Sequence, residues 1–250
     1  MQYGVCPQNV VALRIAPDDA SEMSSQVLYG EHFKILEGRK KWSRIRLSYD
    51  GYEGWVRNIQ ILKIPEKEFE ALDGAQNLKY ASEIISHICI NNHMLMPVLL
   101  GSVVTSTKSL EHTFEGNAME GILPKSKLVD VALLYLKAPY LRGGRTPFGI
   151  DSSGFVQQVY RINGYQLKRE AEEQAKQGEA LSFIEESEPG DLAFFDNSEG
   201  IINHVGIILE DNYIIHCFGE VRIDRLDHTG IFNTDNKLYS HQLRVIKKVI

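Results

Sequence analysis

A glycine-rich turn that leads directly into an amphipathic helix is the feature that most constrains the fold of this chain. Residues 140–150 contain three glycines, and residues 151–155 then read Asp-Ser-Ser-Gly-Phe. Apolar residues recur at helical spacing over residues 152–163 and end at Asn163-Gly164, which is typical of a helix terminus. A helix is also predicted over residues 127–136, and the strands that carry the histidines follow, so a helical layer followed by antiparallel sheet predicts an α+β domain.

Two histidines lie on predicted strands after this helix. His204 belongs to the apolar run 203–209, and His216 to the run 213–218. A two-residue loop between the runs would put the histidines on opposite faces of a hairpin. A three-residue loop over residues 210–212, or a bulge, would put them on one face as diagonal neighbours about 7 Å apart. A shared catalytic role therefore requires the odd-numbered loop.

Loop, helix, strand and two-histidine hairpin, in this order over residues 125–250, resemble the NlpC-type cell-wall cysteine peptidases, which have a papain-like fold. In that family the helix opens with Asp-Cys-Ser-Gly-Phe, so Ser152 stands where the nucleophilic cysteine is expected. The resemblance implies that His204 is the general base and that His216 orients it. It also implies that Tyr140 lies near the oxyanion.

The resemblance further implies a substrate and the residues that bind it. Such enzymes cleave the γ-D-glutamyl–diamino acid bond of murein peptides, for example L-Ala-γ-D-Glu linked to diaminopimelate or lysine, and need no metal or cofactor. Asp151 is expected near the free amine and Ser153 near the γ-D-glutamyl carboxylate, although both residues could simply cap the helix. Arg142 replaces a tryptophan of the family pattern and places a charge on the groove wall.

The N-terminal quarter of the chain reads as a small β-barrel. Residues 1–64 contain short apolar-polar runs separated by turns, and residues 42–56 resemble a bacterial SH3-like domain. Tyr52 and, more weakly, Glu31 are candidates for closing the N-terminal end of the substrate groove, and with these contacts the SH3-like domain would be part of the active site. Residues 65–124 read as a charged linker with a second, shortened SH3-like subdomain, in which residues 82–90 fit either helix or strand.

Serine in the nucleophile position changes the expected activity. A helix N-terminus and a nearby imidazole can hold a cysteine as thiolate, but the pKa of a serine hydroxyl is far too high for this. Loss of a triad nucleophile costs about 10^6 in rate, so the chain as written is expected to be nearly inactive. Ser152 is interpreted either as an engineered replacement that traps substrate or as a natural variant.

Other functions remain open at this point. A murein-peptide binding protein with a native Ser152 would bind without cleaving, and a true serine hydrolase or acyltransferase would use Ser152 with His204. A metal site ranks below both, because no acidic or cysteine ligand joins His204 and His216 at recognisable spacing.

Composition excludes several classes of partner. The net charge of -6 and the lack of a long basic run argue against nucleic acid. The longest apolar run, residues 94–104, is too short to span a bilayer and contains proline and glycine. The three cysteines have no metal-ligand spacing, and residues 1–7 show no secretory pattern, so a reducing cytoplasm and recycling of murein peptides are expected. The oligomeric state does not follow from the sequence.

Overall fold

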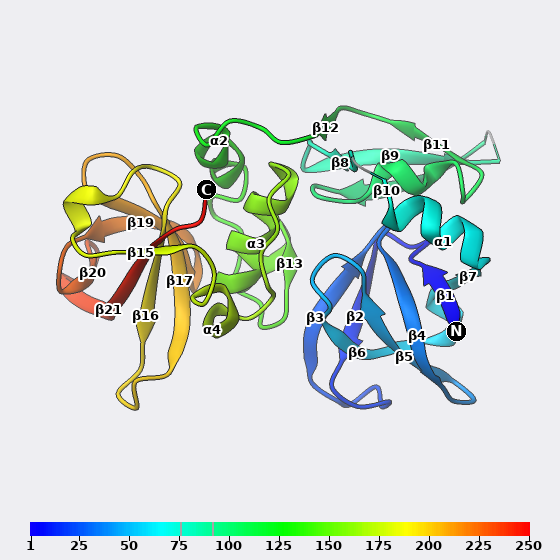
Figure 1. The fold of residues 1–250 in the computed structure, drawn as a ribbon, viewed down its shortest axis with the longest axis horizontal. Helices are drawn as coiled ribbons and strands as arrows, with labels where there is room; N and C mark the ends of the chain where they lie inside the picture. Colours follow the sequence, from blue (N-terminus) through cyan, green and yellow to red (C-terminus); the bar gives the residue numbers. More distant parts are fainter. Residues whose placement is uncertain (76, 92) are drawn as a thin grey trace. The chain divides into compact units, whose positions relative to one another are not determined.

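The structure is a computed structural model that describes residues 1–250 except 76 and 92, both within the segment predicted to be linker and second subdomain. The chain divides into two compact units (Figure 1). Residues 1–122 and 142–147 form the N-terminal unit, and residues 123–141 and 148–250 form the C-terminal unit. Among the described residues, no helix is long and apolar enough to cross a membrane.

The N-terminal unit begins with a seven-stranded antiparallel sheet of order β3-β2-β6-β5-β4-β1-β7. Its strands are β1 (Gln2–Val5), β2 (Val10–Arg14), β3 (Met23–Leu28), β4 (His32–Gly38), β5 (Trp42–Leu47), β6 (Glu53–Arg57) and β7 (Leu62–Ile64), with the 3-10 turn η1 (Asn58–Gln60) before β7. Inward-facing residues such as Phe33 and Ile45 form its core. Alternate side chains face inward on β5, where Ile45 is buried and Arg44 and Arg46 are exposed, as a half-buried strand requires. This is the expected SH3-like region.

The rest of the N-terminal unit packs on that sheet through a second core containing Tyr29, Phe69 and Ile88. Its elements are α1 (Glu66–Asp73), β8 (Lys79–Ala81), β9 (Ile85–Ile90), β10 (Met94–Leu99), η2 (Val104–Thr107), β11 (His112–Glu115), β12 (Ala118–Glu120) and the short β13 (Arg145–Thr146). Strands β10, β9 and β11 form one small sheet, and β12 pairs with β8. Residues 82–90 thus contain a strand. Their assignment to a second SH3-like subdomain stays a prediction.

The C-terminal unit contains a closed six-stranded barrel, in which β21 pairs with both β16 and β20. The barrel strands are β16 (Leu192–Asp196), β17 (Ile202–Ile208), β18 (Tyr213–Phe218), β19 (Glu220–Leu226), β20 (Gly230–Asn233) and β21 (Leu238–Lys248). The unit also contains β14 (Gly149–Ile150) and β15 (Glu179–Leu181), and β15 pairs with β21. Apolar side chains such as Phe195, Ile208, Ile214 and Leu226 fill the barrel.

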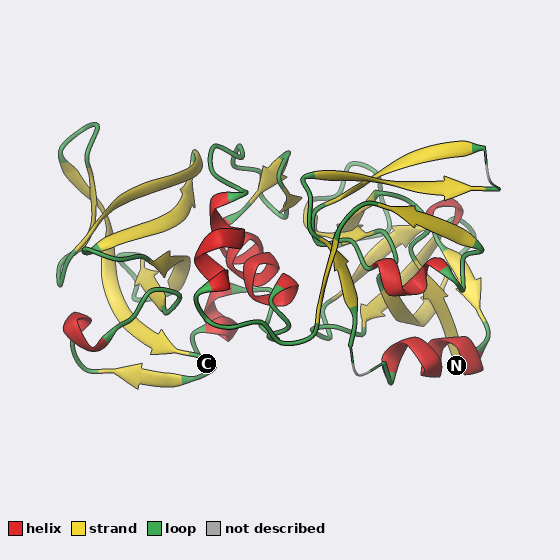
Figure 2. Cartoon of the chain, turned by 90° about the horizontal axis from the view of Figure 1, so that it is seen from above, coloured by secondary structure: helices red, strands yellow, loops and turns green. Residues whose placement is uncertain are grey.

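Helices lie to one side of this barrel (Figures 1 and 2). They are α2 (Lys127–Leu133), α3 (Ser152–Ile162) and α4 (Ala171–Gln174). The 3-10 turn η3 (Ile184–Glu186) lies apart from them, on the other side of the barrel (Figure 1). Helix α3 packs against α2, β17 and β18, and all of its residues are buried. The helix expected over residues 152–163 is therefore confirmed, and the unit has the α+β architecture that the sequence predicts.

The hairpin of β17 and β18 has the register that a shared histidine site requires. Gly206 pairs with His216, and Ile208 pairs with Ile214. The amide of Leu209 donates to the carbonyl of Tyr213, which leaves residues 210–212 as a three-residue loop. His204 and His216 are consequently on the same face, as the odd-loop interpretation demands.

Candidate active site

A pocket of about 500 Å³ in the C-terminal unit brings together three of the residues singled out in the sequence. Tyr140, Ser152 and His204 all line this pocket, with His241 and Cys217 beside them. Four elements supply most of the wall, namely the start of α3 and the strands β17, β18 and β21. The pocket therefore combines a hydroxyl at a helix N-terminus with imidazoles on a rigid barrel.

Ser152 is the first residue of α3 and is only 7% exposed. The preceding Asp151 caps the helix, because its Oδ1 accepts a hydrogen bond of 2.7 Å from the amide of Gly154. The first amides of a helix lack partners within the helix and favour negative charge. A group at position 152 thus lies where an oxyanion can be stabilised.

Arg169 holds the two residues that flank Ser152. Its guanidinium donates to both carboxylate oxygens of Asp151, at 3.0 and 2.6 Å, and to Oγ of Ser153 at 3.0 Å. The Arg169 side chain is almost completely buried, and Asp151 is mostly buried. Asp151 and Ser153 are therefore fixed in one network, and their contacts with substrate stay predictions.

A continuous row of side chains runs from His204 through His216 to Asp224. Nε2 of His204 lies 2.9 Å from Nδ1 of His216, and Nε2 of His216 lies 3.1 Å from Oδ2 of Asp224. Arg222 donates to both oxygens of Asp224, at 2.6 and 3.0 Å. His216 and Asp224 are fully buried, and His204 is 6% exposed.

This row determines where the protons lie. Burial opposes ionisation of Asp224, but hydrogen bonds from His216, Arg222 and the Thr234 amide hold the pKa of its carboxyl well below the usual range. The carboxylate can only accept, so His216 carries its proton on Nε2 and presents the lone pair of Nδ1 to His204. His204 then donates through Nε2 and keeps a lone pair on Nδ1. A neutral imidazole held in that tautomer is a general base.

Burial and neighbouring imidazoles keep the base neutral. Desolvation, followed by the positive charges that His241 and His216 would carry, lowers the pKa of His204 well below its ordinary value. Desolvation also lowers the pKa of His216, against the opposing effect of Asp224. Both imidazoles are therefore uncharged at neutral pH and able to accept a proton.

His241 is the third imidazole of the site. Its ring stacks on that of His204, with centroids 3.9 Å apart and an interplanar angle of 21°. Its Nδ1 lies 2.9 Å from Oγ of Ser240, and its edge meets the ring of Phe218. Burial lowers the pKa of His241 to about 4, so this ring is neutral as well.

Gly206 makes room for His216. A Cβ at position 206 would lie 2.9 Å from Cβ of His216 and 2.7 Å from the side chain of Ile214. Such contacts are shorter than real Cβ atoms make. The glycine in the sequence His-Val-Gly-Ile therefore permits the close approach that seats His216 beside His204.

Tyr140 and Cys217 both line the pocket, but Tyr140 is exposed to solvent and Cys217 is buried. Tyr140 is 49% exposed, and its amide donates to the carbonyl of Gly219. Cys217 is buried and donates to the carbonyl of Ile150, and burial raises the pKa of its thiol to about 12. Cys217 is therefore an inert packing residue, whereas Tyr140 is accessible for the oxyanion role that the resemblance implies.

The remaining predicted site residues, Tyr52, Glu31 and Arg142, belong to the N-terminal unit. Tyr52 is half-buried and packs against the core of the seven-stranded sheet in the N-terminal unit. Both Glu31 oxygens accept from the buried guanidinium of Arg145 at 3.0 Å, and the Leu28 amide donates to one of them. Arg142 is exposed and pairs with Glu22. Glu31 thus anchors the segment 142–147, and the substrate-binding roles of all three stay predictions.

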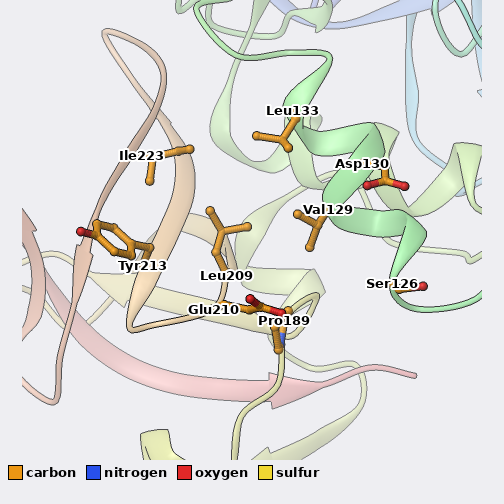
Figure 3. Close-up of a pocket in the computed structure, with 9 residues that line it drawn as sticks. All are labelled: Ser126, Val129, Asp130, Leu133, Pro189, Leu209, Glu210, Tyr213 and Ile223. Carbon is orange, nitrogen blue, oxygen red and sulfur yellow. The ribbon is translucent and has the colours of Figure 1, made fainter.

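A second pocket of the C-terminal unit, of about 550 Å³, has a different character (Figure 3). Val129 and Leu133 from α2 face Leu209, Tyr213 and Ile223 from the barrel across it. Its wall is mainly apolar and contains none of the histidines described above. We therefore assign the candidate active site to the pocket with Ser152.

Comparison with known proteins identifies both regions. Residues 137–240 match the NlpC/P60 family, and residues 13–61 match the bacterial dipeptidyl-peptidase SH3 domain. The chain combines a bacterial SH3 domain with an NlpC/P60 domain. The position of Ser152 within the matched region places the candidate site in the NlpC/P60 domain.

Two dipeptidyl-peptidases are similar to this chain over most of its length. The chain is 26% identical over 234 residues to a gamma-D-glutamyl-L-lysine dipeptidyl-peptidase of Bacillus subtilis, covering 86% of this chain and 75% of that protein. It is 24% identical over 249 residues to dipeptidyl-peptidase 6 of Lysinibacillus sphaericus, covering 84% and 87%. The crystal structure of an NlpC/P60 family protein from Bacillus cereus has the same fold, with a TM-score of 0.78, 18% identity and 99% of each chain covered.

Sequence reasoning missed Asp224, Arg169 and His241. Asp224 could have been found from register, because it pairs with Ile214 and so shares a face with His216. Arg169 lies in the sequence Arg-Glu-Ala, and nothing in that sequence indicates which residues its side chain contacts. His241 lies on the last strand and approaches His204 because β16 pairs with both β17 and β21, which no local pattern indicates.

Proposed function

We propose that the NlpC/P60 domain binds short murein peptides with a free amine and is built to hydrolyse their γ-D-glutamyl–diamino acid bond, and that Ser152 leaves the chain as written nearly inactive. The observation that carries the proposal is the hydrogen-bonded row of His204, His216 and Asp224 beside Ser152. Relatives at about a quarter identity are named as gamma-D-glutamyl-L-lysine dipeptidyl-peptidases, which supports this class of substrate.

With a cysteine at position 152, the site has a role for each group. His204 takes the thiol proton, and the thiolate attacks the γ-glutamyl carbonyl carbon. Amides at the start of α3 and the hydroxyl of Tyr140 stabilise the oxyanion. His204 then gives the proton to the leaving amine, and water releases the acyl group by the reverse sequence. Asp224 and His216 keep the base in the required tautomer throughout.

The proposal includes a cytoplasmic setting, in which the protein recycles imported murein peptides. Cys6, Cys89 and Cys217 are free thiols, and two of them are buried. Free buried thiols are compatible with a reducing compartment.

Cleavage by the Ser152→Cys protein tests the proposal. The substrate is L-Ala-γ-D-Glu-meso-diaminopimelate, and its N-acetylated form is the matched control. We expect the cysteine form to cleave the free-amine peptide at least 10^3 times faster than the chain as written, and to leave the acetylated peptide intact. Binding of the peptide by both proteins without cleavage would instead establish a binding protein.

A serine hydrolase is the second candidate, and the neutral state of His204 favours it. A thiolate–imidazolium pair needs a charged histidine, whereas a serine needs a neutral base, as the lowered pKa of His204 provides. Labelling of Ser152 by a serine-reactive phosphonate, abolished in Ser152→Ala, would support this reading. Absence of labelling together with restored activity in Ser152→Cys would exclude it.

A further inference from the structure

Three histidines meet beside the active-site pocket, where His204 and His241 line the wall and His216 is buried behind them, although the peptidase scheme uses only two. His204 on β17, His216 on β18 and His241 on β21 each offer one nitrogen, and these nitrogens lie within 4.8 Å of one another. Three imidazoles and an open fourth position are a common ligand set for Zn²⁺. The three histidines therefore form a metal-ligand set in space, although their spacing in the sequence does not indicate one.

The surroundings of the three rings resemble those of metal ligands. Metal-binding histidines usually donate their second ring nitrogen to a carboxylate or another oxygen, which fixes the ligating nitrogen. His216 is held by Asp224 through Nε2, which aims Nδ1 at the cluster. His241 is held by Ser240 through Nδ1, which leaves Nε2 as its ligating atom. The described partners thus select one lone pair on each of these two rings.

Small movements bring the three nitrogens to coordination distance. Zn–N bonds of about 2.0–2.1 Å in a tetrahedron separate the nitrogens by roughly 3.3 Å. The His204–His216 separation of 2.9 Å must open slightly, and the ring of His241 must turn out of its stack on His204. His241 is the least buried of the three and lies on the pocket wall. A turn of its ring changes its edge contacts with Phe195 and Phe218.

We propose that His204, His216 and His241 bind one divalent cation of the zinc class, with the fourth coordination position open to water from the pocket. Imidazole nitrogen suits Zn²⁺ and Co²⁺, whereas Mg²⁺ and Ca²⁺ prefer oxygen ligands. A neutral imidazole has one lone pair, so His204 cannot hold the metal and accept a proton at the same time. The metal-bound state and the base-competent state therefore exclude each other.

Direct binding to the chain with Ser152 tests the proposal without any peptide substrate. Untagged, metal-free protein is titrated with Zn²⁺ by calorimetry and with Co²⁺ by visible absorption. We expect one equivalent of either ion to bind, and a Co²⁺ spectrum typical of four-coordinate nitrogen-rich sites. In protein with ¹⁵N-labelled histidine, Zn²⁺ should shift the imidazole resonances of these three residues and leave those of His228, an exposed residue of the same unit, in place.

Variants separate the site from adventitious binding. His241→Phe keeps an aromatic ring against His204 and Phe218 but removes the ligand, and it should weaken Zn²⁺ binding at least 10-fold. Asp224→Asn removes the carboxylate behind His216 and should weaken binding by about 10–100-fold. His228→Asn is the matched control and should bind as the parent does.

Two results would overturn the proposal. One is Zn²⁺ affinity that is unchanged in a folded His241→Phe protein, and the other is failure of Zn²⁺ to shift the three imidazole resonances of the parent. Neither result bears on the peptidase proposal, because cleavage is measured on Ser152→Cys with chelator present. Conversely, an inert Ser152→Cys protein leaves the metal titration as a valid test.

Discussion

Nε2 of His216 lies 3.1 Å from Oδ2 of Asp224, and both side chains are completely inaccessible to solvent. Arg222 completes the arrangement by donating two hydrogen bonds to the same carboxylate. A buried carboxylate is stable only when it is paired and hydrogen-bonded, and here one of its partners is the orienting histidine. Asp224 therefore anchors the chain of hydrogen bonds that runs through His216 to His204.

Replacement of the Asp224 carboxylate should reverse the direction of the hydrogen bonds between residue 224, His216 and His204. In Asp224→Asn the amide can donate to Nε2 of His216, which moves the His216 proton to Nδ1 and prevents His204 from donating to it. In the Ser152→Cys background we expect kcat to fall on the order of 10^2–10^4-fold with little change in KM. Steady-state kinetics and ¹⁵N shifts of the imidazoles measure the two effects.

Asp235→Asn is the matched control for that variant. Asp235 also pairs with Arg222 but is largely exposed, so its loss should leave the tautomers and kcat close to those of the parent. Unchanged imidazole shifts in a folded Asp224→Asn protein would show that Asp224 does not set the tautomer.

The sequence reduced the relation of the two histidines to the length of one loop, and the structure decides between the two lengths. The loop over residues 210–212 has the odd length that puts His204 and His216 on one face, and the helix from Ser152 begins at the expected residue. Asp224 could have been found by the same rule, because β18 and β19 are consecutive strands, whereas His241 depends on the non-local pairing of β21 with β16. Periodicity reports which face a residue occupies, but it does not report which strands become neighbours.

Arg169 is expected to stabilise the start of α3. Arg169→Met would leave the largely buried Asp151 carboxylate without its charged partner, and removal of one member of such a pair is costly. We expect the free energy of unfolding to fall by about 2–4 kcal/mol, measured by urea denaturation. Arg169→Lys keeps the positive charge but cannot donate two parallel hydrogen bonds to the carboxylate. Its free energy of unfolding should therefore lie between those of the parent and Arg169→Met. Equal stability of all three proteins would contradict the assigned role.

Gly206→Ala should displace His216. The added Cβ meets Cβ of His216 at 2.9 Å, so the strand or the imidazole must move. We expect a loss of about 1–3 kcal/mol in the free energy of unfolding, as for other overpacked sites, and altered imidazole ¹⁵N shifts for His204 and His216. Gly38→Ala is the control, because a Cβ there meets nothing within 4 Å. Native-like shifts in Gly206→Ala would show that the glycine is not needed for close approach.

The buried imidazoles should make the protein less stable in mild acid. Burial lowers the pKa of His241 to about 4, whereas an unfolded histidine titrates near 6.5. Between these values the unfolded chain binds more protons than the folded one, so the free energy of unfolding falls as the pH falls. This contribution is complete above about pH 6.5 and is lost progressively down to about pH 4. His204 and His216, whose pKa values are also lowered, act in the same direction.

Thermal unfolding of the parent and of His241→Phe between pH 4 and pH 8 measures the share that belongs to His241. Phenylalanine cannot titrate, so the midpoint temperature of the variant should decrease less steeply than that of the parent as the pH falls from about 6.5 to about 4. Above pH 7 the two curves should run parallel, because His241 is neutral in both the folded and unfolded chains there. His228→Asn should follow the parent over the whole range. Parallel curves for the parent and His241→Phe below pH 6 would show that His241 titrates alike in the folded and unfolded states, and that it is not buried as a neutral ring beside His204.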